Sequence, residues 1–418
     1  MPSTSPSPRN HSQPEADPRR RLLLDVGAAL LSGGLPVHEV EEELRELGHA
    51  LGAADVRAAA LTTGLFVALS ADEATVFQPV GPALRFEQTA DILELVRRLR
   101  IGELDGRQAL SDLDRIRRAP ARWPAWVADL GALPVGVGLC LYLQPALPNV
   151  VAAGIGSLIV AGLTVLARRW PPLRPLVPVT AGFLVSVLVL LAARASLLDG
   201  ALRTIVATLA ILLPGSLLVT GLSEIAAGAA SAGTARLVSG SVQMALFLTG
   251  VVAAATATHA PAIALANVQV PEAGWWTICL GLALAVAGII VNVNAPLPAI
   301  PWIVAVVAVT AAVQVTLSST NGAAVGGLAG AVTAAIAASI AHWMPRGPSW
   351  RVAYLPAFWI VVPGSFGLLN AAQIEVGDGA HSVVMAVSAV FGVSVGTLIG
   401  SVISRIPRPT VALQRWRY

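Results

Sequence analysis

The feature that most constrains this chain is the stretch from Ala273 to Pro345, which contains no charged side chain. Charge is scarce overall: 12% of the residues are charged and 55% are apolar, whereas about 25% of a typical soluble domain is charged. An uncharged stretch of this length is typical of helices that cross a lipid bilayer. The sequence therefore predicts a polytopic α-helical membrane protein.

The charged residues gather near the N-terminus. Residues 1–122 contain 15 of the arginines and 18 of the 24 acidic residues. We therefore predict a soluble domain over residues 21–122, preceded by a Pro- and Ser-rich tail over residues 1–20 that we expect to be disordered. The net charge of +3 is too small to indicate nucleic-acid binding.

The soluble segment has the pattern of a small α/β domain. Leu22–Leu31 and Pro36–Leu51 are predicted as helices, because apolar residues recur there at helical spacing. The stretch that follows is rich in Val, Phe and Thr, with Gly and Pro at intervals, and predicts two or three short strands. Charged amphipathic helices are expected from about Thr89 to Arg118. We interpret the segment as a cytosolic accessory domain.

Missing residues disfavour several enzyme classes. The chain has no lysine, which removes the P-loop and Schiff-base chemistry. The motif from His38 to Glu42 resembles a zinc-protease helix but lacks the second histidine, and Cys140 and Cys279 lie in apolar stretches. We expect no catalytic residue, no metal and no cofactor. A membrane-anchored hydrolase is the least favoured alternative.

Ten apolar stretches after Trp123 are long enough to span a bilayer. They form two sets of five, within residues 123–264 and 265–405, and a basic tail over residues 406–418 follows them. The predicted spans are 125–144, 147–167, 175–193, 202–222, 237–258, 274–294, 299–318, 322–344, 352–373 and 381–404.

Two of these predicted spans are interrupted in the same way. A Pro-Gly-Ser triplet lies in the fourth span of each set, at Pro214–Ser216 and at Pro363–Ser365. Because five is an odd number, the second set must cross the membrane in the opposite sense to the first. The sequence thus predicts an inverted 5+5 repeat, as found in secondary transporters with broken helices.

A Pro-Gly pair inside a membrane helix leaves backbone groups without helical partners. The proline frees a carbonyl one turn earlier, and the residues after the pair begin a half-helix with unpaired amides. Lipid cannot satisfy such groups, and the positive end of a half-helix suits a carboxylate. A proline kink tolerated for packing is the alternative. The predicted substrate-binding residues at the breaks are Pro214, Gly215, Ser216, Pro363, Gly364 and Ser365.

Two acidic residues, Asp129 and Glu224, lie in or beside predicted spans and are candidates for coupling transport to an ion. Glu224 follows the first break by two turns and is also a candidate substrate ligand. A charge at mid-bilayer is costly and therefore usually has a purpose, but either acid could instead lie at the interface. Asn370 is a further candidate ligand, and the neutral residues Asn292, Asn294, Gln314 and Gln373 are candidates for lining a path.

Loop arginines orient the predicted spans. If the soluble domain is cytosolic, the inside loops and tail carry ten arginines, while the outside loops carry only Arg194 and Arg203. This distribution agrees with the positive-inside rule. The two outside arginines are also candidates for a functional role, such as recruiting anionic substrates.

Three segments resemble the threonine/serine exporter family. "LLLDVGAALLSGGLPVHEVEEELRELGHALG" is similar to its opening helices, "LLPGSLLVTGLSEIAAGAASAGTARLV" to its Pro-Gly segment, and "VVPGSFGLLNAA" to its second membrane unit. The resemblance covers about residues 22–405. It implies a bacterial plasma-membrane exporter of threonine and serine, driven by the proton gradient, with the soluble domain and C-terminus in the cytosol.

The chain departs from the family pattern after the first Pro-Gly pair. The family often has Asn and Asp there, where this sequence has Thr220-Gly221 and Glu224. The acid is kept and the amide is lost, so the substrate stays open between small hydroxy amino acids and small dicarboxylates such as succinate, to which split relatives are linked. The sequence also leaves open whether the chain forms a homo-oligomer.

Overall fold

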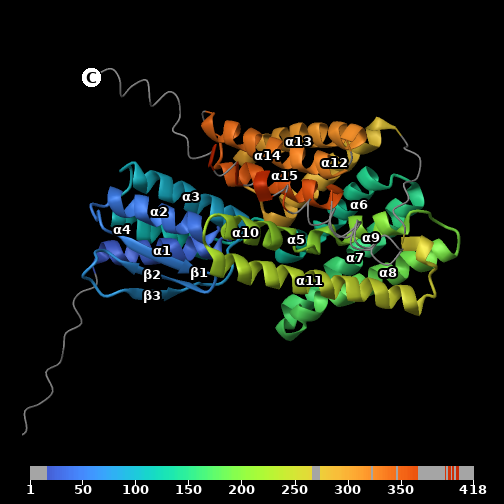
Figure 1. Cartoon of the computed structure of the whole chain (residues 1–418), viewed down its shortest axis with the longest axis horizontal. Helices are drawn as coiled ribbons and strands as arrows, with labels where there is room; N and C mark the ends of the chain where they lie inside the picture. The colour runs from blue at the N-terminus through green and yellow to red at the C-terminus, as the bar shows by residue number, and fades with distance from the viewer. Residues whose placement is uncertain are drawn as a thin grey trace, which may run out of the picture. The chain divides into compact units, whose positions relative to one another are not determined.

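The computed structural model describes residues 17–265, 274–321, 323–344 and 347–365, with positions 391, 394–396, 398–399 and 402–403. The described chain falls into two compact units (Figure 1). The first extends to Leu84 and resumes over Asp91–Ala119, and the second comprises Arg85–Ala90 and the chain from Pro120 onward. Each unit is described by itself below.

The first unit combines helices with a small sheet. The sheet is antiparallel in the order β1-β2-β3, and its register places Phe66 opposite both Ala59 and Phe77. Helix α1 packs against β2 and β3, and α2 packs against β1. The elements are α1 (Pro18–Ser32), α2 (Val37–Ala50), β1 (Arg57–Leu61), β2 (Gly64–Ala68), β3 (Val76–Pro79), α3 (Phe86–Arg100) and α4 (Gly106–Arg118).

The helix pattern read from the sequence accounts for the core of this unit. Val40, Leu44 and Leu47 of α2 recur at helical spacing and are fully buried. Helix α1 begins at Pro18, inside the stretch predicted as a disordered tail. The reason is a local cap: the Asp17 side chain accepts a hydrogen bond from the Arg19 amide at 2.8 Å, and Pro18 occupies the first helical turn. The rest of the predicted tail, residues 1–16, lies outside the described residues.

The second unit is helical throughout its described part. Long helices alternate with short helical turns, and most of them begin or end at the boundaries predicted from hydropathy. The elements are α5 (Ala125–Leu130), α6 (Ala132–Leu143), α7 (Leu147–Arg169), η1 (Pro171–Leu176), α8 (Val177–Arg194), α9 (Ala201–Leu209), η2 (Ala210–Leu212), α10 (Gly215–Ala226), α11 (Ala230–Ala257), η3 (Ala262–Leu265), α12 (Trp275–Val293), η4 (Leu297–Ala299), α13 (Ile300–Asn321), α14 (Ala323–Trp343) and α15 (Trp350–Ser365).

Seven helices of the described chain are long and apolar enough to cross a membrane, and one bent pair adds an eighth candidate span. They correspond in order to the first eight predicted spans. The ninth is described only as far as Ser365 and most of the tenth lies outside the described residues, so the predicted count of ten is not tested. The chain is a polytopic membrane protein.

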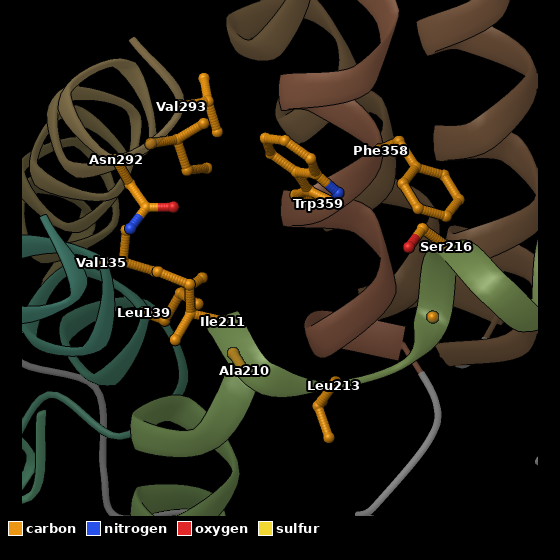
Figure 2. A pocket seen from close by; sticks show the side chains of 12 residues that line it. Val135, Leu139, Ala210, Ile211, Leu213, Ser216, Asn292, Val293, Phe358 and Trp359 are labelled. Carbon is orange, nitrogen blue, oxygen red and sulfur yellow. The ribbon is translucent and has the colours of Figure 1, made fainter. Parts of the chain in front are cut away.

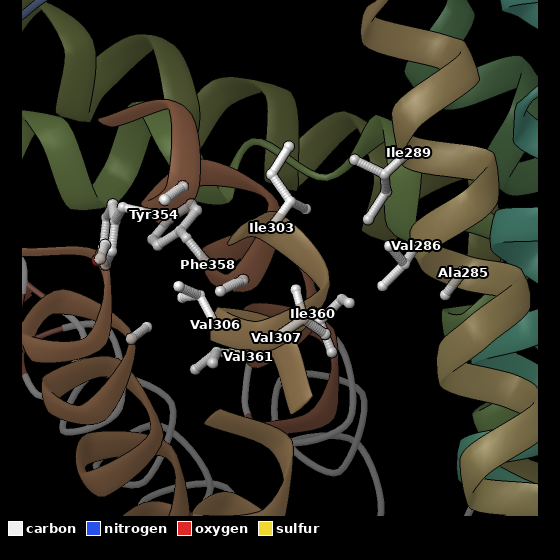
Figure 3. Packing of buried hydrophobic residues seen from close by; sticks show 14 of the residues in the cluster. Ala285, Val286, Ile289, Ile303, Val306, Val307, Tyr354, Phe358, Ile360 and Val361 are labelled. Carbon is white, nitrogen blue, oxygen red and sulfur yellow. The ribbon is translucent and has the colours of Figure 1, made fainter. Parts of the chain in front are cut away.

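Helices α12, α13 and α15 pack together around a shared apolar core (Figure 3). Ile289 of α12, Ile303 and Val306 of α13, and Phe358 and Val361 of α15 are each at most 5% exposed. These side chains come from helices whose composition is nearly uniformly apolar, so burial inside the protein, not hydrophobicity, distinguishes the core from the lipid-facing surface.

Glycines allow α6 and α12 to approach each other closely. A Cβ atom on Gly131 would lie 2.8 Å from the carbonyl oxygen of Gly288, and one on Gly281 would lie 2.6 Å from that of Gly138. Contact between the start of one helix and the end of the other shows that the two helices are antiparallel. No side chain fits at these four positions without separating the helices.

Candidate functional site

The first Pro-Gly pair breaks a membrane-spanning helix. Helix α9 tightens into the 3₁₀ turn η2, which ends at Leu212, and Leu213 is extended with φ −65° and ψ 136°. Pro214 then caps α10, and the two halves are bent by 65°. The interruption predicted within this span is therefore present in the fold.

A cavity of about 200 Å³ opens at this break (Figure 2). Four elements surround it: α6, the α9–α10 break, α12 and α15. Figure 2 shows the extended link through Leu213 joining the two halves at the cavity and the ring of Trp359 projecting from α15. The lining residues are Val135, Leu139, Ala210, Ile211, Leu213, Gly215, Ser216, Ile289, Asn292, Val293, Phe358 and Trp359.

The polar groups of the cavity lie at the start of α10 and on α12. Gly215 and Ser216 are the first residues of α10, whose opening amides have no partner within the helix. Asn292 projects from α12, and its Nδ2 donates to the Ala128 carbonyl oxygen at 2.9 Å. Its Oδ1 therefore faces the cavity as an acceptor. None of the lining residues is charged.

The second Pro-Gly pair looks different in the described backbone. Helix α15 runs through Pro363 and Gly364 and ends at Ser365, where the description of this segment stops. The break expected at Pro363 is therefore not seen within the described residues. A proline can continue a membrane helix because it removes only one helical hydrogen bond, which neighbouring groups can replace.

Each proline nevertheless deprives the carbonyl four residues before it of a helical hydrogen bond. Pro214 offers no amide to the carbonyl of Ala210, which accepts a 3₁₀ bond from Leu213 N at 3.2 Å instead. Pro363 likewise offers no amide to the carbonyl of Trp359. Ala210 and Trp359 are each four residues before a proline, and both line the cavity. The cavity is thus lined by the first Pro-Gly segment and by the turn of α15 that precedes the second.

Glu224 lies inside α10, two turns beyond the break, and is not among the cavity-lining residues. It is fully buried, and its carboxylate is 3.1 Å from the guanidinium Nε of Arg236 on α11. The predicted spans 202–222 and 237–258 left both residues in the loop between them; these two bounds are wrong. Helix α10 extends to Ala226 and α11 begins at Ala230, so the linker between them is shorter than hydropathy suggests.

Asp129 forms another ion pair between the membrane helices. It lies in the short helix α5, its side chain is 12% exposed, and it pairs with Arg168 in the last turn of α7. The neighbouring Ala128 carbonyl is the one that Asn292 holds. Asp129 is thus one residue away from a hydrogen bond that ends at the cavity wall.

The remaining polar candidates are spread over the unit. Asn294 accepts a hydrogen bond from Trp123 N at 3.1 Å and Gln314 donates to the Val361 carbonyl oxygen at 3.3 Å, and neither side chain lines the cavity. Arg194 and Arg203 donate to the carbonyls of Thr258 and Leu143, at 2.7 and 3.1 Å. Asn370 and Gln373 lie outside the described residues, and nothing is described of the Pro363, Gly364 and Ser365 side chains.

The sequence reading missed the apolar walls of the cavity. Phe358 and Trp359 face it from α15, and Val135 and Leu139 face it from α6. The one available signal was position: Trp359 comes one turn before Pro363, where a freed carbonyl is expected. Within the described residues no group of three or more His, Cys, Asp or Glu side chains could hold a metal.

A family model described as "Putative threonine/serine exporter" matches residues 21–258, more than half of the chain. The chain belongs to the threonine/serine exporter family. The matched residues include the first unit, the Pro-Gly break at Pro214 and both ion pairs, and the family predicted from the sequence is confirmed. Comparison with curated proteins and with solved structures gave no match.

Membership of this exporter family, together with seven candidate spans, indicates a protein of membrane transport. Broken helices beside a binding site are also common in secondary transporters. The residues after Thr258 lie beyond the family match, although α12 and α15 supply five of the twelve residues that line the cavity.

Proposed function

We propose that this exporter carries threonine, serine or a similarly small amino acid out of the cell by secondary active transport driven by the proton gradient. The observation that carries the proposal is the cavity at the α9–α10 break, which joins the start of a half-helix to an amide side chain and an aromatic wall. Its volume of about 200 Å³ is below the 300–1,000 Å³ typical of pockets for drug-sized ligands. A small amino acid suits it.

A zwitterion matches the chemistry of the lining. The carboxylate would accept hydrogen bonds from the first amides of α10 and from the Ser216 hydroxyl. The ammonium would donate to Asn292 Oδ1 and lie against the face of Trp359, where a cation is attracted by the ring. Because the lining has no charged residue, a molecule with no net charge fits it better than a dianion.

The same lining disfavours dicarboxylates as the main substrate. A second carboxylate would need a cationic partner, and the two candidates from the sequence, Arg194 and Arg203, donate to the carbonyls of Thr258 and Leu143 instead. Efflux of preloaded radiolabelled threonine from proteoliposomes, with succinate in a parallel arm, separates the two substrates. Export of succinate without threonine would contradict the proposal.

We also propose that the membrane unit is an inverted 5+5 repeat. Gly131 and Gly138 of α6 recur as Gly281 and Gly288 of α12, 150 positions later, and the contacts between them are reciprocal. An antiparallel contact between equivalent positions is what a two-fold axis in the membrane plane requires.

A second pair of contacts supports the repeat. Gly182 of α8 packs on the Phe247 carbonyl of α11, where a Cβ added to the glycine would lie 2.8 Å from that oxygen. In the second half, a Cβ on Gly396 would lie 2.8 Å from the Ala331 carbonyl carbon of α14. Ala331 lies 149 positions after Gly182, and Gly396 lies 149 positions after Phe247. The same offset of 149 positions relates Pro363 to Pro214.

We assign the soluble domain and the C-terminus to the cytosol of a bacterial cell and the transporter to the plasma membrane. The positive-inside distribution of arginines supports this orientation. In this orientation two ion pairs lie at the cytosolic ends of their helices. They are Asp129 with Arg168 and Glu224 with Arg236.

Proton coupling would use one of the two acids. Asp129 is connected to the cavity through the Ala128 carbonyl and Asn292, whereas Glu224 is connected through the length of α10. A neutral variant of the coupling acid should abolish accumulation driven by a pH gradient while leaving threonine exchange across the membrane. Asp129→Asn and Glu224→Gln, each assayed for driven efflux and for exchange, distinguish the two acids.

A further inference from the structure

The carbonyl two residues before each Pro-Gly pair receives a hydrogen bond from a glutamine. Gln243 Nε2 of α11 donates to the Leu212 carbonyl oxygen at 3.1 Å, and Gln314 Nε2 of α13 donates to the Val361 carbonyl oxygen at 3.3 Å. Leu212 precedes Pro214 by two residues, as Val361 precedes Pro363. The two contacts therefore serve equivalent points of the chain.

The glutamines themselves are not repeat copies. The position 149 residues after Gln243 is Gly392, and the position 149 residues before Gln314 is Val165. Gln243 comes from α11, after the first break, whereas Gln314 comes from α13, before the second Pro-Gly pair. Different helices thus supply the same donor to the same backbone position.

Stability alone does not explain Gln314. Its side chain is 2% exposed, and its Oε1 is buried without a hydrogen-bond partner among the described residues. An unpartnered buried acceptor costs free energy, so an apolar residue of similar length would remove that cost. We therefore attribute the role of Gln314 to the hydrogen bond that its Nε2 donates to the Val361 carbonyl oxygen.

The carbonyls concerned lie beside the cavity wall. Ile211 and Leu213 flank Leu212, and Phe358 and Trp359 lie within one turn of Val361; all four line the cavity. Fixing the two carbonyls therefore fixes the direction in which these wall residues project. Each glutamine ties its Pro-Gly segment to a neighbouring helix, so loss of the contact would loosen the segment that it holds.

We propose that Gln243 and Gln314 are positioning residues, one for each Pro-Gly segment, that hold the cavity walls in their binding geometry. They act through the backbone and need not touch the substrate. The transport measurement that tests this inference rests on the proposed function. The hydrogen-exchange measurement rests on the fold alone.

The test replaces each glutamine by methionine in the full-length protein, which keeps the length of the side chain and removes the donor. Gln144→Met is the matched control, since Gln144 is fully buried and its Nε2 donates at 3.2 Å to the carbonyl of Asp199, away from any Pro-Gly pair. In proteoliposomes, Gln243→Met and Gln314→Met should raise the KM for threonine by about tenfold with a smaller change in maximal rate. Gln144→Met should leave the KM near that of the wild type.

Hydrogen exchange provides the readout that does not depend on the substrate. In Gln243→Met the peptide over residues 212–218 should exchange about three- to tenfold faster, and in Gln314→Met the peptide over 359–365 should do so. Gln144→Met should change neither peptide. Unchanged exchange in both glutamine variants, or the same acceleration in the control, overturns the inference. A wild type that moves no threonine overturns the proposed function alone, because the exchange result still decides the role of the glutamines.

Discussion

At the scale of the residue, the buried ion pair between Glu224 and Arg236 is energetically costly to place inside the membrane unit. Taking two charges out of water costs several kcal/mol for each ion, and their attraction offsets this only while both are present. The Glu224 carboxylate is fully buried and the Arg236 side chain is 16% exposed. A pair of this kind is expected where a charge has a function or fixes one arrangement of two helices.

Removing one partner of this pair should therefore destabilise the protein more than removing both. Glu224→Gln is expected to destabilise the protein by about 3–5 kcal/mol, because Arg236 loses its counter-charge. The double variant Glu224→Met with Arg236→Met should recover most of the loss. Thermal unfolding in detergent measures both; equal Tm values for the single variant and the wild type would contradict the account.

The cap of α1 gives a residue-scale prediction about pH. The pKa of Asp17 is lowered, mainly by the hydrogen bond from the Arg19 side chain. A carboxyl with a lowered pKa in the folded state contributes stability above its ordinary value of 3.8, and this contribution is lost as the pH falls through the lowered value. Because Asp17 is exposed to solvent, the charge effect itself is small.

Replacing Asp17 by alanine should fray the first turn of α1 at neutral pH. Loss of an N-cap acceptor costs about 1 kcal/mol, so amide exchange over Arg19–Leu22 should quicken about fivefold. Asp17→Asn keeps an acceptor oxygen without the charge and should stay close to the wild type. Exchange mass spectrometry of the intact protein measures both variants; identical rates for Asp17→Ala and wild type would show that the cap contributes nothing.

At the scale of the element, glycine positions decide how closely the helices pack. The contact of α6 with α12 depends on the absence of side chains at Gly138 and Gly281, since a Cβ on either would collide with the opposite backbone. By contrast, a Cβ on Gly162 of α7 would meet nothing within 4 Å. Gly138 and Gly281 are therefore needed for close helix packing, whereas Gly162 is not.

The pair Gly138→Ala and Gly162→Ala tests this difference. Gly138→Ala should force α6 and α12 apart and destabilise the protein by about 1–3 kcal/mol. Gly162→Ala should stabilise it by up to about 1 kcal/mol, because alanine is the better helix former and the site has room. Tm values measured in the same detergent compare the two, and a neutral Gly138→Ala would show that the close packing is not needed.

At the scale of the whole molecule, the proposed topology places the two segments Pro171–Leu176 and Ser196–Gly200 on opposite sides of the membrane, because α8 joins them. With both native cysteines replaced, a cysteine at Leu197 should react with an impermeant maleimide on intact cells. A cysteine at Leu173 should react only after permeabilisation. Labelling of both from the same side would exclude the proposed topology.

Much of this organisation could be predicted from the sequence. Hydropathy predicted the order and approximate bounds of eight of the described membrane helices, because lipid demands a long apolar segment at each crossing. The Pro-Gly pair at Pro214 predicted the break, because proline offers no amide to the carbonyl one turn earlier. The same reasoning predicted a break at Pro363, where α15 instead continues to Ser365. The first unit's helices and its strands were likewise visible in their periodicities.

The tertiary structure alone decided which residues meet at the cavity. Every face of a membrane helix is apolar, so the sequence could not tell the wall formed by Phe358 and Trp359 from the faces that contact lipid. Nor could it pair Glu224 with Arg236, or find the glutamines that hold the two carbonyls. Those contacts join helices that are distant in the chain, and only packing in three dimensions brings them together.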